Sequence, residues 1–170
     1  MEMGGMRFIF VGLSGKIVDK AFDVILTNVP GAKLDKANLV PHAPMRGGKI
    51  RYPNQQEMEQ GWRLLARKMA QTKVEIVILL GRQVADFVRP RISIVDVRDV
   101  EGRFVKWAAT DGKGRVIVAA AHPSYVGVYA RKHIDDYAQE IFKMAAQAWA
   151  MREEEVLEQK KEPVRKPVLR

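Results

Sequence analysis

The histidine at position 122 stands where a side chain could take part in chemistry. The run before it, VIVAAA over residues 116–121, is short, apolar and partly β-branched, and predicts a buried strand. Pro123 ends that strand, because proline cannot donate to a sheet ladder and restricts the residue before it. His122 is therefore expected at the carboxyl edge of a sheet, where open parallel sheets bind ligands. A lone His-Pro pair is also typical of an ordinary turn.

A second polar segment, FVGLSGK at residues 10–16, has the glycines and the lysine of a phosphate or nucleobase cradle. The apolar run over residues 6–12 predicts the first strand, and a helix is expected from Ser14 to about Phe22. A complete P-loop has a longer glycine spacing and a Ser or Thr after its lysine, where this chain has Ile17. The segment argues against NTP hydrolysis, so a nucleotide-binding enzyme ranks last among the functions considered.

The third candidate is Asn28, at the end of DVILTN, residues 23–28, which we expect to be the second strand. Its amide offers both a hydrogen-bond donor and an acceptor, so it can pair with a ligand edge that presents both. Asparagine just before Pro30 is also typical of a turn. The HPS sequence downstream favours a binding role for this amide.

Three segments, in this order, resemble the uracil-DNA glycosylase superfamily: FVGLSGK at 10–16, ILTN at 25–28 and HPSYVGVY at 122–129. The central LLGRQVADFV, residues 79–88, resembles a structural segment of the same family. The likeness spans roughly residues 10–144 and is closest in pattern to the iron–sulfur members. It implies cleavage of the N-glycosidic bond of a base flipped out of DNA.

The resemblance also implies roles for single residues. His122 would stabilise the departing uracil anion, and Asn28 would read the edge of the base. Phe10 would stack on the flipped base if the register of the first strand matches the family's, and would otherwise be a core residue. Val126 would be the wedge that fills the vacated space in the base stack. The other residues predicted to bind the substrate are Gly12, Ser14, Ser124 and Tyr125.

The chain departs from the family in two respects. The usual first motif, a Gly-Glu or Gly-Asp-x-Pro-Gly loop that positions water, is missing from MEMGGMRFI, residues 1–9. We favour loss of that loop, which makes Phe10 a core residue, over an upstream segment that was never present. Glu2 and Asp19 are the nearest carboxylates and are typical of solvated surface charges. The absence of cysteine excludes an iron–sulfur cluster and thiolate zinc sites, and with three histidines we expect neither a cofactor nor a metal.

The charge balance indicates a polyanionic partner. The chain has 29 Lys and Arg against 20 Asp and Glu, a formal net charge of +9. Residues 31–53, punctuated by proline and glycine, predict a long polar loop that supplies several cations. Basic proteins can also be merely soluble, and part of the excess lies in the tail from Lys160 onward. The predicted contacts with the DNA backbone are Lys16, Arg46, Lys49, Arg51, Arg82, Arg131 and Lys132.

The alternation of strands and helices predicts the α/β class: a three-layer α/β/α fold around a central, mainly parallel sheet of about four strands, as in uracil-DNA glycosylases. Residues 1–150 are assigned to this domain, and residues 151–170 to a charged helix extension and a basic flexible tail that could hold a protein partner. The other expected elements are a helix that begins with a capping box at Asn54–Glu57, a strand over residues 74–80, a helix after Gly81, short strands over 92–97 and 103–107, a turn at Asp111–Gly112, and a helix from Ile134 to about Glu158.

Two functions of different classes follow from these observations. As an enzyme, the chain would excise uracil, or a related damaged or modified base, from single-stranded or duplex DNA. As a binding protein, it would keep the fold and the basic face but have lost catalysis, which the missing first motif favours. No apolar run approaches the roughly 18 residues of a membrane span, and the first residues lack the layout of a signal peptide. We therefore expect an intracellular monomer.

Overall fold

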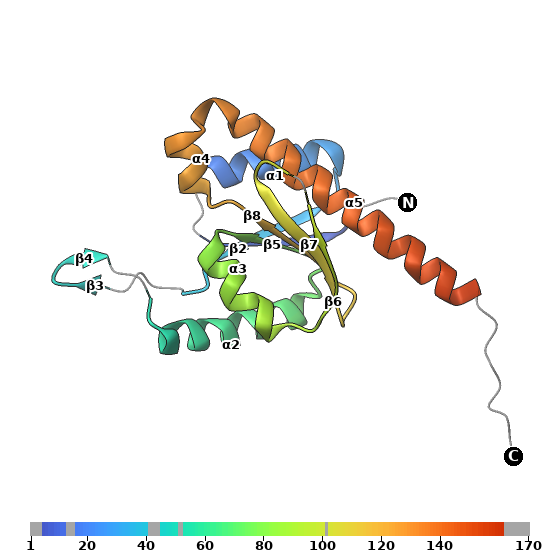
Figure 1. Ribbon diagram of the computed structural model, residues 1–170, viewed down its shortest axis with the longest axis horizontal. Coiled ribbons are helices and arrows are strands. Elements are labelled where there is room, and N and C mark those ends of the chain that lie inside the picture. Colours follow the sequence, from blue (N-terminus) through green and yellow to red (C-terminus); the bar gives the residue numbers. More distant parts are fainter. Residues whose placement is uncertain (1–4, 13–15, 41–44, 51–52, 101, 162–170) are drawn as a thin grey trace, which may run out of the picture.

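A six-stranded sheet lies between helices on both of its faces in the computed structural model (Figure 1). The structure describes residues 5–12, 16–40, 45–50, 53–100 and 102–161. The α/β sandwich that the sequence predicts is confirmed, with six strands in place of about four. Four neighbouring strands are parallel, and the last two continue the sheet antiparallel. The strand order is β2 (Lys33–Ala37), β1 (Arg7–Val11), β5 (Ile76–Leu80), β8 (Val116–Ala120), β7 (Val105–Asp111) and β6 (Ile94–Asp99).

Each face of the sheet buries one apolar cluster under its own helices. Phe8 and Phe10 of β1 point into the cluster under α1, α4 and α5, while Ile9 and Val11 point into the cluster under α2 and α3. Strands β5 and β8 are buried along their whole length, as expected for parallel strands covered on both faces. The helices are α1 (Lys16–Asn28), α2 (Gln55–Thr72), α3 (Arg82–Val88), α4 (Pro123–Tyr129) and α5 (Ile134–Lys161), with short 3-10 turns η1 (Arg89–Arg91) and η2 (Arg131–His133).

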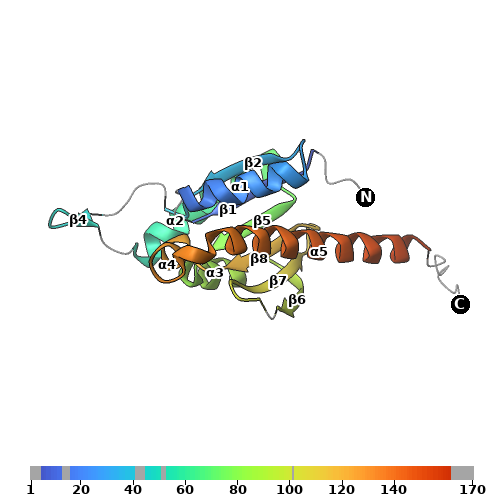
Figure 2. The same ribbon diagram turned by 90° about the horizontal axis from the view of Figure 1, so that it is seen from above.

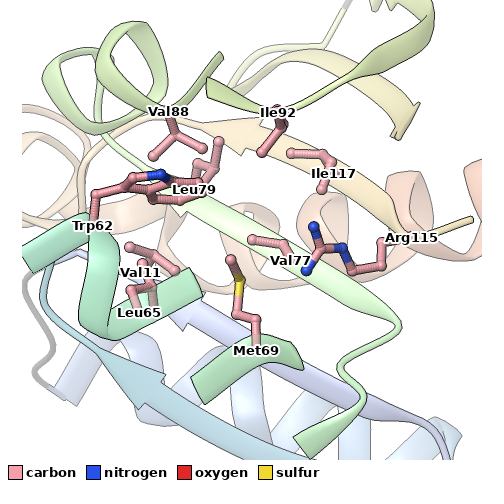
Figure 3. A pocket seen from close by; sticks show the side chains of 10 residues that line it. All are labelled: Val11, Trp62, Leu65, Met69, Val77, Leu79, Val88, Ile92, Arg115 and Ile117. Atoms are coloured by element: carbon pink, nitrogen blue, oxygen red, sulfur yellow. The ribbon is translucent and has the colours of Figure 1, made fainter. Parts of the chain in front are cut away.

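The core between α2 and the sheet is closely filled. Figure 3 shows side chains from α2, the sheet and the segment after α3 meeting around a void of about 10 Å³. A void of that size holds at most about one water molecule, so it is not a ligand site. The Arg115 guanidinium reaches the same region, and its Nε donates to Oδ2 of the buried Asp111 at 2.6 Å. That ion pair closes the turn between β7 and β8.

The start of α2 matches its sequence prediction. Asn54 is the N-cap: its side chain accepts from the backbone N–H of Glu57 at 2.8 Å, and the Glu57 side chain accepts from the Asn54 N–H. Further along, Gly61 packs directly on the backbone of Leu39, where an added β-carbon would stand 1.7 Å from the carbonyl oxygen. This close approach fixes the segment that follows β2.

The prediction of a strand over residues 23–28 is wrong. These residues are the second half of α1, because Val18, Ala21 and Ile25 repeat at helical spacing and share one buried face. The second strand is instead β2, which lies within residues 31–53, where the sequence predicts a polar loop. It is an edge strand that pairs with β1 alone, so its KLDKA sequence needs little apolar surface.

Two further elements differ from the sequence prediction. Within the same predicted loop, β3 (Met45–Arg46) and β4 (Lys49–Ile50) form a hairpin that projects from the body of the molecule (Figures 1 and 2). Helix α5 runs without a break from Ile134 to Lys161, which agrees with the helix predicted from Ile134 to about Glu158. Over the described ranges, no helix is long and apolar enough to cross a membrane.

Gly61→Ala should destabilise the protein, although alanine is the better helix former. The added carbon forces the Leu39 backbone away from α2, and overpacking of this kind costs about 1–3 kcal/mol of unfolding free energy. Urea denaturation measures the change. Gln60→Ala, at the neighbouring exposed position of α2, is the control and should alter stability by less than about 0.5 kcal/mol. Equal stability of Gly61→Ala and wild type would contradict the close approach.

Candidate active site

The carboxyl ends of the four parallel strands lie in a row and define one edge of the sheet. Asn38 follows β2, Gly12 follows β1, Gly81 follows β5, and Ala121–His122 follow β8. Backbone hydrogen bonds continue across this edge, from the Gly12 N–H to the Ala37 carbonyl and from the Gly81 N–H to the Ala120 carbonyl, each at 2.9 Å. We call this row the carboxyl edge. It is where an open parallel sheet binds its ligand.

Two of these positions require glycine. Gly12 has φ of 144° and Gly81 has φ of 99°, both in the region that side chains strain. A β-carbon on Gly12 would lie 2.9 Å from the Leu80 carbonyl oxygen, and one on Gly81 would lie 3.0 Å from Cδ2 of His122. The absence of a side chain at Gly81 therefore lets the His122 ring pack against the end of β5.

Local hydrogen bonds fix the protonation of His122. This residue is the N-cap of α4, and its Nδ1 accepts from the Ser124 backbone N–H at 3.0 Å. The Ser124 Oγ lies 2.6 Å from the same nitrogen. Because a backbone N–H can only donate, Nδ1 carries no proton, and the neutral ring carries its proton on Nε2. Burial lowers the pKa of His122 below its ordinary value, which favours this neutral form. The ring therefore presents an Nε2–H donor without a net charge.

The peptide that precedes His122 is held from both sides. The Ala121 N–H donates to the Phe104 carbonyl at 2.8 Å, and the Tyr137 hydroxyl donates to the Ala121 carbonyl at 2.6 Å. Tyr137 is buried on α5, and burial raises the pKa of its hydroxyl far above the physiological range, so it remains a donor. Its ring meets Phe104 edge to face, with 5.4 Å between centroids. Tyr137 is thus a positioning residue for the strand end that carries His122.

The structure does not bring Asn28 to His122. Helix α1 runs back along the sheet from the carboxyl edge, so Asn28 lies near the opposite edge, beside the starts of β1 and β2 (Figure 2). Its amide Nδ2 donates to the Val24 carbonyl at 2.8 Å, within the helix. The asparagine that follows the second strand is Asn38. Sequence reasoning missed it because β2 is too polar to be recognised as a strand.

Two other predicted contacts are buried in the core. Phe10 is 1% exposed and packs edge to face on Phe22, so it is a core residue, as the favoured account of the first strand predicts, and cannot stack on a base. Val126 is 0% exposed because α4 turns it under the helix, so it cannot be the wedge. The same helix exposes Tyr125 at 53% and Val128 at 72%. The segment after His122 is therefore a short helix with an exposed apolar side chain.

The remaining predicted residues fall into three groups. Arg82, Arg131 and Lys132 are exposed, at the start of α3 and in η2, on segments that begin at the carboxyl edge. For Lys16, Arg46 and Lys49 the structure describes only the backbone, and Ser14 and Arg51 lie outside the described residues. The hairpin and α4 lie at the same end of the molecule in both views (Figures 1 and 2).

Carboxylates contribute little to this edge. Asp19 is exposed in the first turn of α1 and lies 3.7 Å from the Lys36 ammonium, while Glu2 lies outside the described residues. Over the part of the chain that the structure describes, no three His, Asp or Glu side chains cluster as metal ligands would. The chemistry that the site offers is hydrogen-bond donation by a neutral imidazole.

Tyr137→Phe should leave the fold intact but loosen His122. Loss of the hydroxyl leaves the Ala121 carbonyl unsatisfied, at a cost of about 1–3 kcal/mol of stability. NMR of a ¹⁵N-labelled histidine sample should show the Nε2–H tautomer in the wild type and a titration midpoint below the ordinary value of 6.5. In the variant the ring is less firmly packed and better hydrated, so its midpoint should rise toward 6.5.

Ile141→Val is the matched control, because Ile141 is fully buried on the same helix. It should cost about 0.5–1.5 kcal/mol of stability while leaving the tautomer and the midpoint of His122 unchanged. If Tyr137→Phe lowered stability without moving the His122 titration, Tyr137 would be a packing residue and not a positioning one.

The family of the chain follows from its sequence as a whole. Residues 2–146 match the model of the uracil DNA glycosylase superfamily. No curated protein matches the chain. The match spans most of the 170 residues and includes both the strand ends of the carboxyl edge and the HPS segment. The chain therefore belongs to the uracil DNA glycosylase superfamily and is a DNA glycosylase-like protein.

Proposed function

We propose that the chain is an enzyme that excises uracil, or a closely related base, from DNA after flipping it out of the helix. The observation that carries this proposal is His122, held at the carboxyl edge as a neutral Nε2–H donor. Family membership makes DNA the expected substrate. The basic side chains that surround the carboxyl edge fit such a substrate.

The reaction replaces the bond between C1′ of the sugar and N1 of the base with a bond from C1′ to a water oxygen. The electron pair of the broken bond leaves with the base, so negative charge develops on the uracil ring and its O2. A hydrogen bond from the His122 Nε2–H to O2 stabilises that charge without proton transfer. A neutral donor suits this role, because its proton stays on nitrogen while the charge grows. Removal of one such donor typically lowers the rate about 100- to 1,000-fold.

Asn38 takes over the base-reading role in this proposal. It follows β2 at the carboxyl edge and its side chain is exposed. Strands β2 and β8 are three strand spacings apart in the sheet, roughly 14 Å at the usual spacing. That gap accommodates a flat base with one side chain on either side of it. The Asn38 amide would pair with the carbonyl and N–H edge of uracil, while His122 would serve the opposite side.

The wedge, the apolar side chain that fills the space left by the flipped base, is assigned to Val128 of α4. Val128 is 72% exposed, in a helix whose N-cap is His122 itself. An apolar side chain this close to the base pocket can fill the space that the flipped base leaves, and so offset part of the unstacking cost. Tyr125, also exposed, offers a second flat surface on the same helix.

A single-turnover cleavage assay tests the enzyme directly, with uracil in a single-stranded oligonucleotide and in a U·G duplex. Wild type should release uracil, His122→Ala should be slower by about 100-fold or more, and Asn38→Ala should also lose most of its rate. Asn28→Ala is the matched control. It removes the same amide from the other end of the sheet and should cut at the wild-type rate.

These variants test the role of His122 separately from the choice between Asn28 and Asn38 as the base reader. Persistent excision by His122→Ala would rule out the mechanism, and loss of excision in Asn28→Ala with Asn38→Ala still active would reverse the reader assignment. A wild-type protein that binds the oligonucleotides without cutting them would instead be a glycosylase fold that serves as a DNA-binding accessory. The absence of the usual water-positioning motif from residues 1–9 favours that second candidate.

Val128→Ala should slow excision from the duplex by about tenfold and leave the single-stranded substrate nearly unaffected, because only a duplex has a stack to fill. The comparison uses the same assay with both substrates. Val126→Ala provides the contrast: that side chain is in the core, so the variant should lose stability and show no preference between substrates. Equal slowing of both substrates by Val128→Ala would remove it as the wedge.

A further inference from the structure

A cleft opens at the amino edge of the sheet, on the side away from His122. Its volume is about 530 Å³, within the range of small-molecule sites. Three separate parts of the chain line it: the end of α2 with the start of β5, the turn between β7 and β8, and the middle of α5. None of its lining residues belongs to the candidate active site.

The lining is rich in cations, and two of them have no counter-ion. The Arg115 guanidinium pairs with Asp111, and Arg152 pairs with Glu153 at 2.6 Å. Among the described residues, neither Lys73 nor Lys113 makes an ion pair, and both line the cleft. The lining as a whole has four cationic side chains against two carboxylates, Glu75 and Glu153, and this excess of positive charge favours an anionic ligand.

The wall of the same cleft contains polar donors without acceptors. Within the described part of the chain, two buried side-chain polar atoms lack a hydrogen-bond partner: Nε1 of Trp149 and Nε of Arg152. Both belong to residues that line this cleft, and the Arg152 guanidinium lies over the Trp149 ring at 4.6 Å. Trp149 is 6% exposed. Both atoms are N–H donors that the protein itself covers, so they are unsatisfied polar groups behind the surface of the cleft.

Lys73 is also held in an unusual backbone conformation. Its φ is 53°, the one positive value among the described residues other than glycine. It closes α2 at a position where glycine, which adopts this conformation without strain, is the common choice. This turn ends α2 at Lys73, which lines the cleft.

We propose that this cleft binds a phosphate group, held by the ammonium groups of Lys73 and Lys113 above the Trp149–Arg152 wall. A phosphate supplies negative charge that the excess of cations in this lining lacks, and its oxygens can accept charge-assisted hydrogen bonds from the two lysine ammonium groups. The group belongs either to a small phosphorylated ligand or to a DNA strand that passes the amino edge. The proposal does not depend on whether the chain excises a base.

NMR of the full ¹⁵N-labelled chain tests the proposal through the indole N–H signal of Trp149. The chain has three tryptophans, and Trp149→Phe identifies the signal. Inorganic pyrophosphate, thymidine monophosphate and a short single-stranded oligonucleotide are titrated separately. At least one should move the Trp149 signal saturably, with half-saturation below about 1 mM. The double variant Lys73→Ala with Lys113→Ala should weaken that response at least tenfold.

Lys143→Ala, which removes an exposed lysine from the same helix as Trp149, is the control and should bind as the wild type does. A response to the small ligands supports a small-molecule site, and a response to the oligonucleotide alone supports a DNA contact at this edge. A Trp149 signal that none of the three ligands moves would overturn the proposal. An equal response in the double lysine variant would overturn it as well.

Discussion

The peptide bond between Ala121 and His122 is the constraint on which the candidate site depends. The Ala121 N–H donates to the Phe104 carbonyl, and the Tyr137 hydroxyl donates to the Ala121 carbonyl, which belongs to this peptide bond. The first partner lies just before β7, and the second lies on α5, beneath the sheet. The antiparallel extension of the sheet and the long last helix therefore converge on one strand end. Ser124 then fixes the ring, so one imidazole is oriented by three parts of the chain.

At the carboxyl edge the charged side chains are exposed, whereas the imidazole of His122 is partly buried. The cations Arg82, Arg131 and Lys132 are exposed, where hydration keeps them charged and phosphates can reach them. His122, the group that we propose acts on the departing base, is partly buried and neutral. Protonation of His122 at Nδ1 would break the contact that caps α4, the helix that presents Val128. The neutral state of the ring and the placement of the apolar side chain thus depend on the same hydrogen bond.

The sequence predicts those parts of the fold that local patterns determine. The apolar runs of β5 and β8, the capping box of α2 and the end of β8 at His122 are all where the sequence predicts them. It fails at α1 and β2, because ILTN contains β-branched residues while KLDKA contains mostly charged ones. Because of that error the sequence predicts Asn28 as the base reader, whereas the asparagine that follows the second strand, and that we propose for this role, is Asn38. The hydrogen bond from Tyr137 to Ala121 depends on how α5 packs against the sheet. No local sequence pattern predicts that packing.

The absence of the usual water-positioning motif is compatible with this architecture, because the residues that we propose for the departing base follow other strands. The proposed groups that serve the departing base, His122 and Asn38, follow β8 and β2. The usual water-positioning motif would lie upstream of Phe10 of β1, within residues 1–9, and β1 lies between β2 and β5. Gly12, at the end of β1, offers only backbone groups and lies against Leu80. Changes upstream of Phe10 therefore leave the hydrogen bonds that orient His122 untouched, and stabilisation of the leaving base can persist without a carboxylate to position water.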